Sequence, residues 1–190
     1  MIPNFFANQK SNFKSILIDS NYFQGREIKM LQLGAWAGHA SEWLCNNING
    51  HLTDVDAWAG SVAGPNNEKS LSIIQDIDIA EAEKEYYERT GGLPVTTFKG
   101  TTNEFFEQNT EKFDFIYVDA SHIREDVEMD GENALKVLNP GGLIVFDDFL
   151  WYYGKDIDLV PYGAVLDILK NHYSEIKPLM MNYQAWIQKL

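Results

Sequence analysis

The chain has a single cysteine, few basic residues and no long hydrophobic run, and each shortage excludes a class of protein. Cys45 alone cannot form an intrachain disulfide, which fits a reducing compartment, so a cytoplasmic protein is expected. The 28 Asp and Glu residues outnumber the 15 Lys and Arg residues, so the net charge is −13. Because nucleic-acid phosphates are bound by clustered cations, no nucleic-acid partner is expected. No run could span a bilayer, and the charge disfavours anionic lipid, so no membrane partner is expected.

The N-terminus also lacks the pattern of a secretory signal, and the remaining composition is that of a folded protein. Residues 1–13 contain no basic start followed by an apolar core. Hydrophobic residues make up 45% of the chain and aromatic residues 13%, which is enough to build a packed core. With 190 residues, the chain is predicted to form a single domain over 1–190, with residues 1–27 as an N-terminal helical cap.

The stretch 113–151 is the most informative part of the sequence and indicates strand, helix, turn and strand. Residues 113–118 are aromatic and β-branched, as in a buried parallel strand. Apolar residues then recur at helical spacing over 123–138, and Ser121 is expected to cap this helix. The Asn-Pro-Gly-Gly sequence at 139–142 ends the helix, and 143–146 is a second buried strand. This crossover predicts two parallel strands.

The rest of the chain alternates strands and helices in the same way. This alternation predicts an α/β fold with a seven-stranded, mostly parallel sheet, an antiparallel C-terminal strand and helices on both faces. A loop is expected over 57–67. Helices are expected at 5–17, 39–47, 71–89, 103–109 and 162–173, and strands at 28–33, 51–55, 95–99 and, as a C-terminal hairpin, 175–181 with 184–189.

Acidic residues follow both strands of the informative stretch. Asp119 follows the first strand, and Asp147 and Asp148 follow the second. Ligands of parallel α/β sheets bind outside the carboxyl ends of the strands, so these side chains are expected to converge there. Three carboxylates could hold a hard divalent cation. The alternative interpretation is structural, because paired aspartates after a strand often form a turn and cap a helix.

A glycine turn follows the first predicted strand. Gly34 and Gly38 would let a ligand approach the backbone near a helix N-terminus, and Asp56, 22 positions after Gly34, could accept hydrogen bonds from ribose hydroxyls. A dinucleotide fingerprint would need glycine where the chain has Trp36 and His39, so NAD-dependent redox chemistry is disfavoured. The alternative is that the glycines only permit a tight turn and Asp56 only caps one.

Taken together, these motifs resemble the class I S-adenosylmethionine-dependent methyltransferases. The resemblance is strongest to the metal-dependent small-molecule O-methyltransferases of the catechol and macrocin type, and it implies their Rossmann-like fold. The family usually has an acid at the position of Gln32, so this chain departs from the pattern there. The matching segments are LQLGAWAGHASEWL, VDAWAGS, KGTTN, FDFIYVDASH and NPGGLIVFDDFLW.

The resemblance implies an S-adenosylmethionine site, a Mg²⁺ site and a hydroxylated acceptor. A hydroxyl is a poor nucleophile at neutral pH, so a bound cation would activate it and His122, three positions after Asp119, could remove its proton. His122 could instead be an ordinary residue of the first helical turn. The metal would be held by Asp119, Asp147 and Asp148. The cofactor would contact Gly34, Ala35, Trp36, Gly38, Ser41, Asp56, Trp58, Thr102, Asn103 and Asp119.

The sequence therefore predicts a Mg²⁺-dependent O-methyltransferase that acts on a hydroxylated small molecule such as a sugar, a glycoconjugate precursor or a catechol-like compound. Two alternatives stay open. One is a metal-independent methyltransferase that acts on another atom, and the other is a non-catalytic S-adenosylmethionine-binding module. The sequence does not identify the acceptor. Homo-oligomerisation is also open, as is the choice between pocket and core for Trp36, Trp58 and Trp151.

Overall fold

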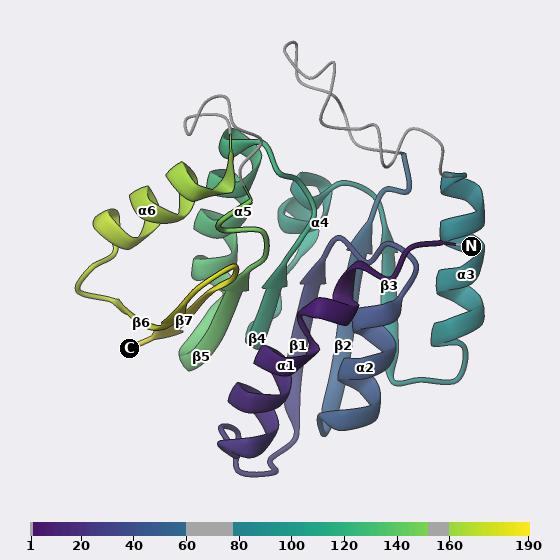
Figure 1. Cartoon of the computed structure of the whole chain (residues 1–190), viewed down its shortest axis with the longest axis horizontal. Coiled ribbons are helices and arrows are strands. Elements are labelled where there is room, and N and C mark those ends of the chain that lie inside the picture. Colours follow the sequence, from purple (N-terminus) through teal and green to yellow (C-terminus); the bar gives the residue numbers. More distant parts are fainter. Residues whose placement is uncertain (1, 60–77, 152–159) are drawn as a thin grey trace.

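The computed structural model describes residues 2–59, 78–151 and 160–190, and its seven strands form one sheet (Figure 1). The strand order is β3-β2-β1-β4-β5-β7-β6. Strands β1 to β5 pair in parallel, and β7 runs antiparallel to both of its neighbours, which confirms the predicted sheet. The strands are β1 (Ile28–Leu33), β2 (Gly50–Asp56), β3 (Val95–Lys99), β4 (Phe113–Val118), β5 (Leu138–Phe146), β6 (Ile176–Met181) and β7 (Ala185–Lys189).

Helices cover both faces of this sheet (Figure 1). The N-terminal segment and α2 lie on one face, with α3 beside α2, and α4, α5 and α6 lie on the other. The N-terminal segment contains a 3-10 helix (Phe5–Asn8), α1 (Lys10–Phe13) and a π-helix (Lys14–Asp19). The remaining helices are α2 (His39–Asn47), α3 (Ile79–Thr90), α4 (Thr102–Gln108), α5 (Arg124–Val137) and α6 (Pro161–Asn171).

Alternate side chains of the central strands enter two separate hydrophobic cores. On β4, Phe115 and Tyr117 face the N-terminal segment and α2, whereas Ile116 and Val118 face α5 and α6. All four side chains are at most 3% exposed. Because both faces are covered, the strand has no polar alternation, and this is why it appears in the sequence as a continuous apolar run.

Several predicted boundaries change in the structure. The helix predicted over 5–17 is divided into three short helices of different hydrogen-bond pattern, because spacing shows which side chains face the sheet but not which carbonyl each N–H reaches. Strand β5 begins at Leu138, so 139–142 belong to it, with a register shift opposite β4. Helix α3 begins at Ile79 among the described residues. The predicted loop beyond residue 59 and the predicted helix from 71 to 77 lie outside them, and the single domain with its 1–27 cap stays a prediction.

The predicted cap of helix α5 is wrong. The helix begins at Arg124, and its N-cap, Ile123, makes no side-chain cap hydrogen bond. Ser121 lies one turn earlier, where its Oγ accepts a hydrogen bond from the Ile123 N–H at 3.2 Å and donates one to Asp126 at 2.8 Å. These bonds hold a turn between β4 and α5, and His122 lies in that turn instead of in the first turn of the helix.

Candidate active site

The glycine turn places the end of β1 against the end of β4. Gly34 has a φ of +89°, and a Cβ at this position would lie 2.2 Å from the backbone oxygen of Asp119. Gly38 (φ +77°) precedes α2, and a Cβ there would meet the Tyr86 ring at 3.1 Å. Both positions therefore need glycine. The first of them brings the predicted cofactor turn into contact with the predicted metal site.

Asp56, at the end of β2, holds the glycine turn from its other side. Its Oδ2 accepts a hydrogen bond from the Trp36 N–H at 2.8 Å, and its Oδ1 accepts one from the Trp58 N–H at 2.7 Å. The Trp58 indole N–H donates to the Trp36 carbonyl at 2.9 Å. Burial raises the pKa of Asp56, while these backbone N–H groups lower it. Each carboxylate oxygen has a second lone pair, so Asp56 can still accept hydrogen bonds from a ribose.

The buried side chains of Gln32 and Ser41 support the glycine turn from inside the protein. The buried Gln32 donates a hydrogen bond from Nε2 to the Gly34 carbonyl at 2.9 Å and accepts one at Oε1 from the Ser41 hydroxyl at 3.3 Å. Ser41 is fully buried, so the structure places this predicted cofactor contact inside the protein beneath the turn. A neutral amide at position 32 thus fixes the turn without a charge.

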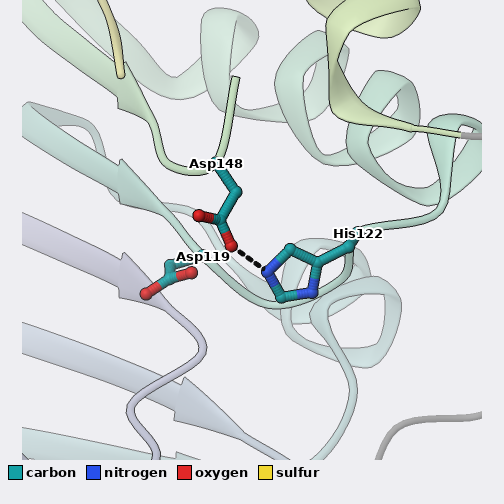
Figure 2. Close-up of side chains that lie close together, drawn as sticks. All are labelled: Asp119, His122 and Asp148. Atoms are coloured by element: carbon teal, nitrogen blue, oxygen red, sulfur yellow. Dashed lines mark ion pairs between the residues drawn. The ribbon is translucent and has the colours of Figure 1, made fainter. Parts of the chain in front are cut away.

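A second group of polar side chains lies beside Asp119. One ligand atom from each of Asp119, His122 and Asp148 lies within 4.8 Å of the others (Figure 2). The His122 Nε2 is 2.6 Å from the Asp148 Oδ2. The Trp151 ring centroid is 4.7 Å from that of His122, which places this tryptophan at the cluster. The three candidate ligands come from the end of β4, the turn before α5 and the end of β5.

Asp147, the third predicted metal ligand, is not part of this group of three and has hydrogen-bond partners of its own next to it. Its Oδ2 lies 2.6 Å from the Tyr117 hydroxyl, and its Oδ1 accepts a hydrogen bond from the Gln184 Nε2 at 2.9 Å. The same Tyr117 hydroxyl is 3.0 Å from the Asp119 Oδ2. Sequence reasoning missed both partners. Tyr117 carried a signal, since it is two positions before Asp119 on the same strand face, but Gln184 follows β6 and carried none.

The electrostatics of the acidic residues favour a cation. Burial raises the pKa of Asp119 well above its usual range, and the Asp147 and Asp148 carboxylates raise it further. Burial and then Asp148 raise the pKa of Asp147. These carboxylates repel one another when ionised, and a divalent cation would relieve the repulsion. Carboxylate oxygens are the ligands that Mg²⁺ prefers, so the side chains of Asp119, Asp147 and Asp148 fit this ion, whereas the His122 nitrogen suits it less well.

The start of α4 carries the predicted adenine contacts. Thr101 and Glu104 form a capping box, in which the Thr101 Oγ accepts from the Glu104 N–H at 3.2 Å and Glu104 accepts from the Thr101 N–H at 2.8 Å. Thr102 is half-buried and hydrogen bonds to Asp130 of α5, whose pKa is raised to about 6, chiefly by burial. Asn103 is exposed at the helix start. Asp130 is a buried partner that the helical pattern of α5 did not single out.

No helix within the described ranges is long and apolar enough to cross a membrane. Among solved structures, a candidate rRNA methylase from Clostridium thermocellum superposes with a TM-score of 0.65 at 15% identity, and all of both chains is covered. An O-methyltransferase from Bacillus cereus, in complex with S-adenosylhomocysteine, has a TM-score of 0.61 at 16% identity, with 95% of this chain and 81% of that chain covered.

A third similar structure is MycE, a methyltransferase of the mycinamycin biosynthetic pathway, in complex with Mg, S-adenosylhomocysteine and mycinamycin VI. Its TM-score is 0.64 at 17% identity, with 98% of this chain and 50% of that chain covered. No curated protein sequence matches significantly. The model of a family described as a methyltransferase domain matches residues 31–149, which include the glycine turn, Asp56 and the carboxylates of Asp119, Asp147 and Asp148 (the acidic cluster). The chain therefore belongs to the methyltransferase-domain family and is a class I S-adenosylmethionine-dependent methyltransferase.

Proposed function

We propose that this enzyme is a Mg²⁺-dependent O-methyltransferase that acts on a hydroxylated small molecule. The observation that carries the proposal is the close approach of Gly34 to the Asp119 backbone, since the glycine turn then lies next to the acidic cluster. Methyl transfer needs a cofactor site and an acceptor site that lie close together, because the methyl donor and the acceptor must be held in line for displacement. The small-molecule complex of MycE with Mg supports the same reading of the acidic site.

The cofactor would be held by the ends of β1, β2 and α4. S-adenosylmethionine, when bound, supplies the methyl group together with its own leaving group. Asp56 would accept hydrogen bonds from the ribose hydroxyls, and Gly34 leaves room for close approach to the backbone. Thr102 and Asn103 would contact the adenine end, and Asp130 would hold Thr102 in place.

The acceptor would be held by the acidic cluster. Asp119, Asp147 and Asp148 would hold Mg²⁺, and the ion would supply Lewis-acid chemistry that makes a nearby hydroxyl easier to deprotonate. Asp148 pairs with His122 through Oδ2, so its Oδ1 is available to the cation. His122, whose Nε2 faces Asp148, would remove the acceptor's proton.

The cofactor assignment can be tested by thermal melts. A ligand that binds only the folded state stabilises it by about 2.7 kcal/mol at a hundredfold excess over its Kd. S-adenosylhomocysteine should therefore raise the Tm of the wild type, and Asp56→Ala should reduce this shift. NAD serves as the control ligand, and a shift with NAD but none with S-adenosylhomocysteine would overturn the cofactor assignment.

The reaction can be tested by following methyl transfer from labelled S-adenosylmethionine to a set of sugars, glycoconjugate precursors and catechols. We expect turnover with at least one hydroxylated acceptor, loss of turnover in chelator and recovery on addition of Mg²⁺. Turnover that persists in chelator would instead indicate the metal-independent alternative. Cofactor binding without turnover for any acceptor, including nitrogen and sulfur nucleophiles, would favour the non-catalytic module.

A further inference from the structure

A run of hydrogen bonds connects the N-terminal helical segment to the acidic residues. Gln184, between β6 and β7, is fully buried and donates from Nε2 to the Asp147 Oδ1 at 2.9 Å. Its Oε1 accepts one hydrogen bond from the Asn12 Nδ2 and another from the Trp186 Nε1, both at 3.0 Å. Asn12 belongs to α1, so a residue from the start of the chain reaches Asp147 through a single intervening side chain.

These partners allow the Gln184 amide one orientation. Two N–H donors face its oxygen and a carboxylate faces its nitrogen. A flipped amide would place its NH₂ against the donors of Asn12 and Trp186 and its oxygen against Asp147, so all three hydrogen bonds would be lost. Unpaired buried polar groups are costly, and Gln184 is therefore locked as a donor to Asp147.

The second group that holds Asp147 is supported by the same segment. The Tyr117 ring packs edge-on against Phe13, with centroids 5.0 Å apart, and Phe13 also packs edge-on against Trp186 at 4.9 Å. The Tyr117 hydroxyl then lies between Asp119 and Asp147. Helix α1 thus supports both hydrogen-bond partners of the Asp147 carboxylate. Asn12 hydrogen bonds to Gln184, and Phe13 packs against Tyr117.

We propose that Asn12 and Gln184 are positioning residues that hold the Asp147 carboxylate and so set the affinity of the acidic site for a divalent cation. Asn12 itself contacts neither the glycine turn nor the acidic cluster. Through Gln184, however, it would make the N-terminal segment a part of the active site. This inference rests on the proposed function, because it takes the acidic residues as the cation site. Outer-shell partners of metal ligands typically change metal affinity by about 10- to 100-fold.

Asn12→Asp is the sharpest test variant. Its carboxylate can only accept, so it would draw the Gln184 NH₂ toward itself and turn the Gln184 oxygen against Asp147. Asn12 is half-buried, and aspartate has the same shape as asparagine, so the new side chain fits the same space. Asn8→Asp is the matched control, since Asn8 lies on the same segment, is exposed and adds the same charge. An added charge alone would strengthen cation binding, which is opposite in sign to the expected effect.

The measurement is calorimetric titration of Mg²⁺, with Mn²⁺ as a second probe, into wild type, Asn12→Asp, Asn8→Asp and Gln184→Met. We expect Asn12→Asp and Gln184→Met to weaken cation binding by about 10- to 100-fold, while Asn8→Asp retains wild-type affinity. Metal-free S-adenosylhomocysteine affinity should stay within about twofold in Asn12→Asp, which a general loss of structure would not allow.

The outcomes separate the two proposals. Wild-type cation affinity in a folded Asn12→Asp variant would overturn the positioning role and leave the proposed function standing. Absence of cation binding to the wild type, with S-adenosylhomocysteine still bound, would overturn the Mg²⁺ site and the positioning role together. Equal weakening in Asn8→Asp would also overturn the inference, because the effect would then not pass through Gln184.

Discussion

At the scale of single residues, His122 owes its place to two neighbours. The Asp148 carboxylate is 2.6 Å from its Nε2, and the Trp151 ring lies against its imidazole. Figure 2 shows the second ring nitrogen of His122 turned away from Asp148. The pairing with a carboxylate fixes the orientation of the imidazole ring and keeps Nε2 beside Asp148.

The first prediction concerns this histidine. General-base catalysis contributes about a hundred- to ten-thousandfold, so His122→Gln should lower turnover by roughly that range and leave S-adenosylhomocysteine affinity unchanged. The measurements are turnover with an identified acceptor and calorimetry with the cofactor product. His51→Gln is the control, because His51 is an exposed residue of β2 and pairs with Thr96. Full turnover in His122→Gln would show that the base lies elsewhere.

The position of a single residue in the fold can be predicted from the sequence when it depends only on the neighbouring residues of the chain. Asp119 and Asp148 follow buried strands of a parallel sheet, so their convergence at one edge can be inferred. The pairing of His122 with Asp148 could not be inferred, because it depends on the turn made by Ser121 before α5. Gln184 was also beyond sequence reasoning, since β7 must run antiparallel to β5 before that side chain can reach Asp147.

At the scale of elements, the β1–α2 turn depends on steric fit as well as on backbone freedom. Gly34 and Gly92 have similar φ angles, +89° and +85°. A Cβ on Gly34 would overlap the Asp119 backbone, whereas a Cβ on Gly92 would meet nothing within 4 Å. The two positions therefore separate the cost of a left-handed backbone from the cost of forcing two strand ends apart.

The second prediction uses this pair. Gly92→Ala should lower the free energy of unfolding by about 1–2 kcal/mol, the usual cost of a left-handed non-glycine residue, and leave S-adenosylhomocysteine binding intact. Gly34→Ala should cost more and abolish that binding, because β1 and β4 must separate at the turn that we propose binds the cofactor. Chemical denaturation and calorimetry measure both effects. Equal costs with cofactor binding intact would mean that the strand ends give way easily.

A buried acid in β2, Asp54, is expected to make the stability of the protein depend on pH. Asp54, in the middle of β2, is fully buried and accepts a hydrogen bond from the Tyr86 hydroxyl at 3.0 Å. Among the described residues, its Oδ1 has no hydrogen-bond partner. Burial raises the pKa of Asp54 to about 7, and the nearby hydroxyls of Ser41 and then Tyr86 oppose this rise.

The third prediction follows from that raised pKa. The folded state holds the Asp54 proton more tightly than the unfolded state, so this group's contribution to stability is complete below about pH 4 and is lost as pH rises through about 7. The total is at most about 4 kcal/mol. Asp54→Asn keeps an acceptor for Tyr86 and removes the titration, so its stability relative to wild type should rise between pH 4 and 8. Urea unfolding across this range is the measurement, and parallel curves would contradict the prediction.

At the scale of elements, prediction from sequence succeeds where a pattern is long. The positions of β1, β3 and α2 agree with the expected ranges because hydrophobic runs and turn residues mark them clearly. The start of α5 was missed because a serine before a helix can stabilise a preceding turn as well as cap the helix itself. The local sequence allows Ser121 either to stabilise a turn or to cap the helix, and the packing of the chain decides which of the two it does.

At the scale of the whole molecule, the net charge of −13 sets limits on partners. The fold alone does not, since one of the similar structures is a candidate rRNA methylase and another is a complex with mycinamycin VI. Phosphate backbones repel a protein of net negative charge, and this chain has only 15 Lys and Arg residues to offset that repulsion. The charge therefore favours a small acceptor.

The fourth prediction is that structured RNA does not bind. With a fluorescently labelled ribosomal RNA fragment at about 0.15 M salt and constant Mg²⁺, anisotropy should stay flat up to high protein concentration, because counterion release needs cationic contacts. A basic RNA-binding protein in the same buffer is the positive control. Saturable binding at micromolar protein that weakens with added salt would show a cationic surface that the net charge conceals, and would favour an RNA substrate.

The central strand pair has a consequence for how the protein is made. Strand β1 pairs with β4, so Met30 lies beside Phe115, 85 positions later in the sequence. During synthesis, β1 can join β2 early, but its other edge has no neighbour until residue 118 has left the ribosome. Contacts between distant segments form slowly, and an unpaired edge invites association with other chains. The nascent first half of this enzyme therefore depends on the second half, or on a chaperone, to protect the strand that leads into the glycine turn.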